Sequence, residues 1–407
     1  LQLKVHQINT IPDALKKIYN PETFEKARLY SMARLRFVLV NHLYNVILTS
    51  AILYVNWYAL VWIKSEQVLK LLHCPNSEIL SSCVFLLFML MYRLLIRMPF
   101  AIYSIFILEE KHGFNKQTVG FFVRDHIKYY LLLSLFSLPI TSTLIYIISR
   151  ESNLLILWLW LFTTILIMLM MIAYPSIIAP LFYKLTPLPD GALKREIERL
   201  AESVNFPLGQ VYVLEGSVRS SHSNAYFGGI FGVKIIILYD TLFEKYDEEK
   251  KQTVGCTVDE LLGVLAHELG HWKCNHIYIR LALIELNFLL TLTAYVLMYK
   301  NSLLYTSLGF PAGQQPIIIG LIVVFKFLII PYDFLMTFLT TFLIRKTEYE
   351  ADEFAVSLNY GEQLEKALIK LSTDNLIYPI NDKLYSIWHH SHPTLLERIE
   401  NIRSKAE

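Results

Sequence analysis

Two histidines and a glutamate stand together in residues 265–272, LAHELGHW, in the H-E-x-x-H arrangement of zinc peptidases. In a helix, His267 and His271 are one turn apart and project from the same face, so both imidazoles can bind one divalent ion. Glu268 lies beside them, where it can take a proton from an attacking water. The sequence therefore predicts a hydrolytic zinc site with Glu268 as the general base.

Zinc at a hydrolytic site uses three protein ligands and keeps one position open, so a third ligand must follow downstream. Residues 346–355, KTEYEADEFA, begin where the last apolar stretch ends. In a helix, Glu348 and Asp352 share a face, whereas Glu350 points about 200° away from Glu348. We predict Glu348 as the third ligand and Asp352 as the carboxylate that holds an imidazole N–H. A solvated acidic face is the alternative interpretation of this run.

The composition of the chain indicates which class of protein carries this site. The 407 residues are 54% hydrophobic, with a mean hydropathy of +0.42, which favours an α-helical polytopic membrane protein. A net charge of +2 without a basic run gives no reason to expect nucleic acid as a partner. The four cysteines form no Cys-x-x-Cys pair, so neither a disulfide framework nor a cysteine zinc site is indicated.

Apolar stretches divide the chain into five parts. We expect a polar N-terminal segment (1–36), four transmembrane spans (37–174), a soluble metalloprotease part with the HELGH helix (175–276), two further spans (277–344), and a C-terminal part with the third ligand (345–407). The first span is expected at 37–63. The fifth, 277–299, is expected to continue the HELGH helix, and the sixth to kink near Pro331.

The number of expected spans predicts which side of the membrane each polar segment faces. Two crossings separate His271 from residue 345, so both pieces of the metal site return to the same side. Seven Lys or Arg residues in 1–36 and four in 109–128 fall on that side, which therefore should face the cytosol.

The soluble part shows an amphipathic helix at 193–204 and strand patterns at 210–214, 224–227 and 234–239. They predict a small sheet beside the metal helix, whose open edge could pair with an extended substrate. From the sequence alone, the preferred interpretation of Asn224 is a turn residue before two glycines.

Ionisable residues at membrane depth favour a water-filled interior, because such groups are costly in lipid. Arg93 and Arg97 are expected to share a helix face, although Arg97 lies near a span end, from which its long side chain can reach the interface. Lys326 and Asp333, seven residues apart and expected on one helix face, are better explained by an internal chamber.

Five motifs together resemble the type I CAAX prenyl endopeptidases, the zinc metalloproteases that process a-factor and prelamin A. They are HELGHW at 267–272, EYEAD at 348–352, SHSNAYF at 221–227, EEKHGFN at 109–115 and WHHSHPTLLER at 388–398. The first two motifs alone would also fit bacterial HtpX-type proteases. The loop at 109–115 and the tail motif favour the CAAX prenyl endopeptidases over these broader relatives.

The resemblance implies a helical barrel of seven transmembrane helices around an internal chamber, with a gluzincin-like metalloprotease domain and a small β-sheet. Six spans are visible in the sequence, and we expect the family's first helix to precede Leu1. Site residues follow by position: His267, His271 and Glu348 bind one zinc, with Glu268 as base and later acid; Asn224 and Ala225 pair with the substrate main chain; and His392 steadies the oxyanion. Arg398 is expected to anchor the tail through acidic partners.

The expected activity is removal of the C-terminal aaX tripeptide from prenylated CAAX proteins, together with a second cut nearer the substrate's N-terminus. The expected location is the endoplasmic reticulum membrane and the inner nuclear membrane, with the site facing the cytosol or nucleoplasm and the lipid bilayer as partner. A general quality-control protease of HtpX type is one alternative. A channel or transporter with a structural metal site is another, although structural zinc normally has four protein ligands.

Overall fold

The computed structural model describes residues 1–75, 77–229, 232, 234–247 and 252–406. Most of them are helical. The helices are α1 (Gln2–Val5), α2 (Pro21–Tyr54), α3 (Trp57–Leu71), α4 (Glu78–Tyr103), α5 (Val119–Ser149), α6 (Leu155–Ala173), α7 (Ala179–Phe182), α8 (Ala192–Ser203), α9 (Val258–Lys273), α10 (His276–Met298), α11 (Ser302–Thr306), α12 (Ile317–Val323), α13 (Ile330–Ser357), α14 (Gly361–Asp374), α15 (Lys383–His389) and α16 (Leu395–Ala406). Short π-helical segments follow three of them, at Ser104–Glu109, Tyr174–Ile178 and Val324–Leu328.

A small mixed sheet has the strand order β1-β2-β4-β3. Its strands are β1 (Leu185–Pro187), β2 (Leu208–Leu214), β3 (Ala225–Gly228) and β4 (Lys234–Tyr239), and a hairpin of β5 (Lys245–Asp247) and β6 (Gln252–Val254) lies apart. β2 and β4 are parallel, whereas β1 and β3 run antiparallel to their neighbours. The expected strands therefore form one sheet, and β3 is an edge strand.

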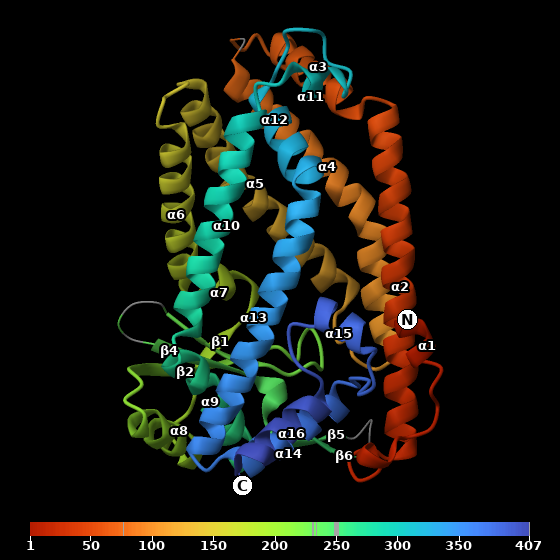
Figure 1. Cartoon of the computed structure of the whole chain (residues 1–407), viewed down its shortest axis with the longest axis vertical. Helices are drawn as coiled ribbons and strands as arrows, with labels where there is room; N and C mark the ends of the chain where they lie inside the picture. Colours follow the sequence, from red (N-terminus) through yellow and green to blue (C-terminus); the bar gives the residue numbers. More distant parts are fainter. Residues whose placement is uncertain (76, 230–231, 233, 248–251, 407) are drawn as a thin grey trace.

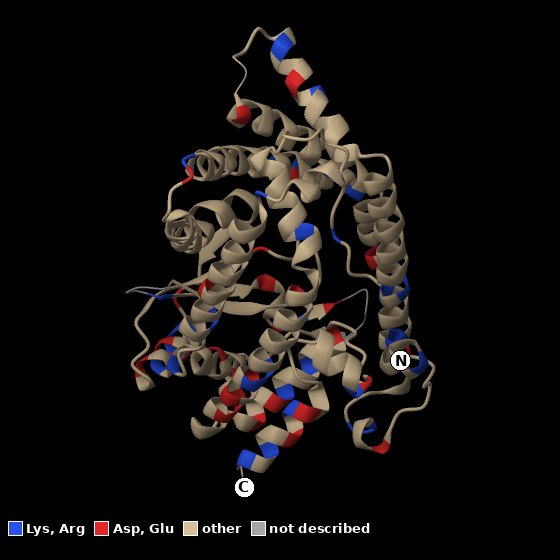
Figure 2. Cartoon of the chain, turned by 45° about the horizontal axis from the view of Figure 1, so that its top comes forward, with Lys and Arg blue, Asp and Glu red and all other residues tan. Residues whose placement is uncertain are grey.

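Five helices of the described chain are long and apolar enough to cross a membrane, and a bent pair could form a sixth span. The five are Pro21–Tyr54, Glu78–Glu109, Val119–Ser149, Leu155–Phe182 and His276–Met298, and the pair is Ile317–Leu328 with Ile330–Ser357. The expected α-helical multi-pass architecture with a small sheet is confirmed. The sheet, α8, α9, α14 and α16 gather at one end of the spans, while α3 and α11 lie at the other (Figure 1). Charged residues crowd around the C-terminus and are sparse along the spans (Figure 2).

Two expected helices are not continuous, and each breaks at an asparagine. The stretch expected as the first span, 37–63, is not one helix: α2 begins at Pro21, capped by the Asn20 side chain, and ends at Tyr54, and α3 begins at Trp57. The fifth span does not continue the HELGH helix, because α9 ends at Lys273 and α10 begins at His276. Asn56 and Asn275 have φ angles of 51° and 59°, a left-handed conformation that asparagine tolerates and that turns the chain.

The expected kink in the last span is confirmed. Its two halves are bent by 59° at Ile329, and Pro331 lies in the first turn of α13. This bend separates Lys326 from Asp333, which therefore do not share one continuous helix face. Lys326 donates a hydrogen bond to the Tyr58 hydroxyl at 2.8 Å, and Asp333 lines a cavity of about 540 Å³ between α10 and α13.

Candidate metal centre

Helix α9 carries the histidine pair, and contacts near each of its two ends fix its position. At its start, Thr257 and Glu260 form a capping box, in which each side chain accepts a hydrogen bond from the backbone of the other. Gly270 allows α13 to approach closely, since a Cβ there would stand 2.9 Å from the Cα of Ala351. This contact sets the HELGH face directly against the acidic face of α13.

The structure brings His267, His271 and Glu348 together, with one ligand atom of each within 4.8 Å of the others. The two Nε2 atoms are 3.2 Å apart, and the Glu348 oxygens lie 3.6 Å from His267 Nε2 and 3.4 Å from His271 Nε2. Bonds of 2.0–2.1 Å in a tetrahedral zinc site place ligand atoms about 3.4 Å apart, so the spacing fits. Glu348 is 1% exposed and its Oε2 has no hydrogen-bond partner among the described residues, as expected for an atom that binds an ion.

Glu268 stands next to this group without belonging to it. Among the described residues its carboxylate has no hydrogen bond or ion pair, so it is available to a water or a substrate. Burial raises the pKa of Glu268 to about 7, and the neighbouring Glu348 carboxylate adds to this effect. A carboxylate with a raised pKa is a stronger base than an ordinary one, which suits proton transfer.

His267 is oriented from behind by two buried charges. Its Nδ1 lies 2.9 Å from Asp352 Oδ1, and Arg398 forms a two-point ion pair with the same carboxylate at 2.5 and 2.9 Å. Asp352 is fully buried and Arg398 is 8% exposed. Since Asp352 accepts the Nδ1 proton, Nε2 is left as the nitrogen that faces the metal group. The acidic partner expected for Arg398 is Asp352.

His271 is oriented by a second relay that the sequence did not predict. Its Nδ1 lies 2.9 Å from Nδ1 of His276, whose Nε2 lies 2.9 Å from Glu350 Oε2. His276 is 1% exposed. Glu350, which points away from Glu348 along α13, thus reaches the site through the first residue of α10. The available signal was a third histidine five residues after His271, but its direction depends on the turn at Asn275.

The carboxylates around His267 change its affinity for protons. Burial and Arg398 lower the pKa of His267, but the hydrogen bond to Asp352 and the nearby Glu348 carboxylate outweigh them and raise it to about 9. For His271, burial dominates and lowers the pKa. The surrounding carboxylates therefore favour the protonated form of His267 when no metal is bound. Arg280, another residue that the sequence did not indicate, lies 3.7 Å from Glu348 Oε1.

Of the remaining expected residues, His392 borders the same group, and Asn224 and Ala225 lie where the edge strand β3 begins. His392 places Nε2 3.5 Å from Glu348 Oε2, and the Ser391 hydroxyl lies 3.1 Å from its Nδ1. Ala225 begins the edge strand β3, and its N–H donates to the Asn224 side chain at 2.9 Å. The Asn224 carbonyl accepts from Tyr239 of the next strand, so the Ala225 N–H points toward the open edge of the sheet.

Comparisons with known proteins cover nearly all of the chain. A family model described as CAAX prenyl protease N-terminal, five membrane helices, matches residues 2–184. A second, described as peptidase family M48, matches residues 187–406. Among curated relatives, the CAAX prenyl protease 1 homolog of Homo sapiens is 39% identical, over 99% of this chain and 91% of that protein. The homolog of Arabidopsis thaliana is 40% identical, over 98% and 92%.

CAAX prenyl protease 1 of Saccharomyces cerevisiae is 35% identical, over 96% of this chain and 87% of that protein. The crystal structure of S. mikatae Ste24p superimposes with a TM-score of 0.90 at 34% identity, covering 98% of this chain and 93% of the other. The expected helical barrel and the expected family are confirmed. The chain is a membrane metalloprotease of peptidase family M48 and belongs to the CAAX prenyl proteases.

Proposed function

We propose that this protein is a zinc endopeptidase that removes the aaX tripeptide from prenylated CAAX proteins, with a second cut nearer the substrate's N-terminus. The observation that carries the proposal is the spacing of His267, His271 and Glu348, which suits one tetrahedral ion beside an unpartnered Glu268. The relatives' names supply the substrate class, and the family does not favour a general quality-control protease or a channel.

In the proposed reaction, His267, His271 and Glu348 would hold the ion, while Asp352 and Arg398 keep His267 oriented. A bound divalent ion polarises the scissile carbonyl and lowers the pKa of water beside it. Glu268 takes the proton of the attacking water and returns it to the leaving amine. His392 donates to the oxygen on which negative charge develops, while Ala225 at the start of β3 and Asn224 directly before it pair with the substrate backbone.

The proposal includes location and organisation. The protein lies in the endoplasmic reticulum and inner nuclear membranes with the site facing the cytosol or nucleoplasm, where the positive N-terminal segment also lies. We also propose the same division of the chain as before: a polar N-terminal segment, two groups of spans, a soluble metalloprotease part and a C-terminal part. A membrane enclosure lets the isoprenoid stay in apolar surroundings while its peptide reaches the site.

The direct test uses purified protein in lipid vesicles with a farnesylated CAAX peptide and the same peptide without the lipid. We expect release of the tripeptide from the farnesylated peptide only, loss of activity with a chelator, and recovery with zinc. Equal cleavage of unprenylated, misfolded proteins would instead favour the quality-control alternative. No cleavage of any peptide by zinc-loaded protein would contradict the proposal.

The raised pKa of His267 predicts how zinc affinity depends on pH. His267 must lose its proton to bind zinc, so protons compete with the metal at every pH below about 9. Affinity should fall by about tenfold for each pH unit from 9 down to 7. Chelator-buffered zinc titrations of the metal-free protein measure this slope. In Asp352→Asn, which removes the main carboxylate partner, the slope should be shallower; a pH-independent affinity in the wild type would be inconsistent with this assignment.

The relay behind His271 predicts a graded effect on metal affinity. His276→Ala removes the group that orients His271, and zinc affinity should fall by about 10- to 100-fold. Glu350→Gln keeps a hydrogen-bond acceptor and should have a smaller effect in the same direction. Zinc titration and thermal unfolding of the metal-free variants separate loss of affinity from loss of fold. Wild-type affinity in both variants would show that the relay does not support the ligand.

A further inference from the structure

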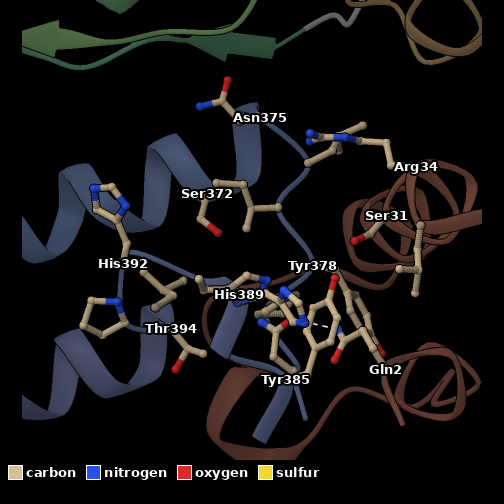
Figure 3. Close-up of a pocket in the computed structure, with 18 of the residues that line it drawn as sticks. Gln2, Ser31, Arg34, Ser372, Asn375, Tyr378, Tyr385, His389, His392 and Thr394 are labelled. Carbon is tan, nitrogen blue, oxygen red and sulfur yellow. Dashed lines mark hydrogen bonds between the residues drawn. The ribbon is translucent and has the colours of Figure 1, made fainter. Parts of the chain in front are cut away.

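A cavity of about 580 Å³ opens beside the metal group, between α2 and the C-terminal part of the chain. His392 and Arg398 line it, and these two side chains lie 3.5 and 3.9 Å from Glu348 Oε2. Ser31 and Arg34 of α2 line it as well. Figure 3 shows His392 and Arg34 on opposite sides of the cavity. Ser372, in α14, and Asn375, directly after this helix, lie between them. A ligand that reached the metal group could therefore extend toward α2.

The lining of this cavity is basic. Two arginines and four histidines face it, and no Asp or Glu is found among its lining residues in the described parts of the chain. Arg398 is neutralised by its two-point contact with Asp352. Arg34 is different, because it is exposed and has no ion pair among the described residues. It is thus the permanent positive charge of the cavity that is free for a ligand, and it favours an anionic one.

Arg34 is also held in place. Its guanidinium carbon lies 5.5 Å from the centre of the Tyr30 ring, one helical turn earlier in α2. Tyr30 is 1% exposed, and its hydroxyl donates to Glu109 at 2.8 Å. Glu109 in turn lies 3.4 Å from His222. Glu109 is therefore hydrogen-bonded by Tyr30 and lies beside His222, and the Tyr30 ring supports the Arg34 guanidinium from one side. The Tyr30 hydroxyl is a further partner of Arg34, and the remaining N–H groups of the guanidinium are available to a ligand.

We propose that this cavity holds the C-terminal tripeptide of the substrate and that Arg34 binds its terminal carboxylate. This inference rests on the proposed function. A tripeptide beyond the scissile bond extends for about 10 Å and always ends in a carboxylate, whatever its side chains are. Arginine binds a carboxylate through two parallel hydrogen bonds. Leu35, Val38 and Leu371 also line the cavity and would contact apolar side chains of the tripeptide. Recognition of the chain end would select the correct bond by its distance from the terminus.

The test compares two prenylated peptides that differ only at the C-terminus, one with a free carboxylate and one with an amide. We expect the wild type to prefer the carboxylate by about 10- to 100-fold in kcat/KM, mainly through KM, since a charge-assisted contact is lost with the amide. In Arg34→Ala the ratio should fall to about one, and in Arg34→Lys to an intermediate value. Arg36→Ala, a matched change two residues along α2 and outside the cavity lining, should keep the wild-type ratio.

Zinc content and thermal unfolding of each variant show whether it is folded. A wild-type enzyme that cuts both peptides equally, or an Arg34→Ala variant that keeps the full ratio, would overturn the inference while leaving the proposed function intact. A metal-loaded wild type that cuts neither peptide would instead refute the proposed function. Binding of the free tripeptide, as acid or amide, to Glu268→Gln gives a readout without turnover; only the acid should bind, and Arg34→Ala should remove that binding.

Discussion

Glu268→Gln is expected to abolish peptide hydrolysis while a full complement of zinc stays bound. The substitution keeps the shape of the side chain but removes its ability to accept a proton, and general base catalysis contributes roughly 100- to 10,000-fold. Zinc remains because Glu268 is not one of the three grouped ligands. Turnover of a farnesylated CAAX peptide and elemental analysis of the same sample measure both halves of the prediction.

The matched control for this variant is Glu400→Gln, on the exposed face of α16. It makes the same chemical change in the same folded protein and should retain activity. Full activity in Glu268→Gln would rule out Glu268 as the base. Loss of zinc from Glu268→Gln would mean that Glu268 helps to hold the ion, and the assignment of the three ligands would have to change.

Glu348→Ala is expected to lose both the metal and the activity. Glu348 is the one ligand from α13, and its oxygens lie within 3.6 Å of both His267 and His271. A change in a residue behind a ligand costs about 10- to 100-fold in metal affinity, so loss of a ligand should cost more. The variant also leaves Arg398 and Arg280 without one of their carboxylate neighbours. Zinc stoichiometry after equilibration with a chelator buffer is the measurement.

Glu350→Ala provides the comparison, because it removes an acid two residues away on the same helix. It should weaken zinc binding through His276 but not remove a ligand, so its effect should be clearly smaller. Equal losses in the two variants would argue that both act through the fold of α13. Stoichiometric zinc in Glu348→Ala would point to Glu350 or another residue as the third ligand.

The parts that the sequence predicted best are those in which chemistry and periodicity coincide. His267 and His271 needed only helical spacing, and Glu348 was indicated by its place where the last span ends. Strands β2, β3 and β4 were indicated by short runs of β-branched or aromatic residues and appear within a few residues of the expected limits, whereas β1 was not predicted. The family resemblance was carried by motifs spread from the loop at 109–115 to the tail.

The parts that it missed depend on single backbone conformations. Asn56 and Asn275 break apolar or helical stretches that look continuous, because a left-handed residue leaves almost no trace in composition. The turn at Asn275 directs His276 back toward His271, so the relay to Glu350 could not be predicted without it. The free charge of Arg34 was equally hidden, since whether an arginine on α2 has a partner depends on contacts between distant segments.

The order of the ligands along the chain has a consequence for biosynthesis. His267 and His271 precede α10, whereas Glu348, His392 and Arg398 follow the bent pair of helices that ends in α13. A nascent polypeptide that has emerged only as far as α10 holds two imidazoles and a base but no carboxylate to close the site. The metal site can therefore be completed only after the last hydrophobic segment has been inserted and the tail has folded back, and we expect no hydrolysis before that stage.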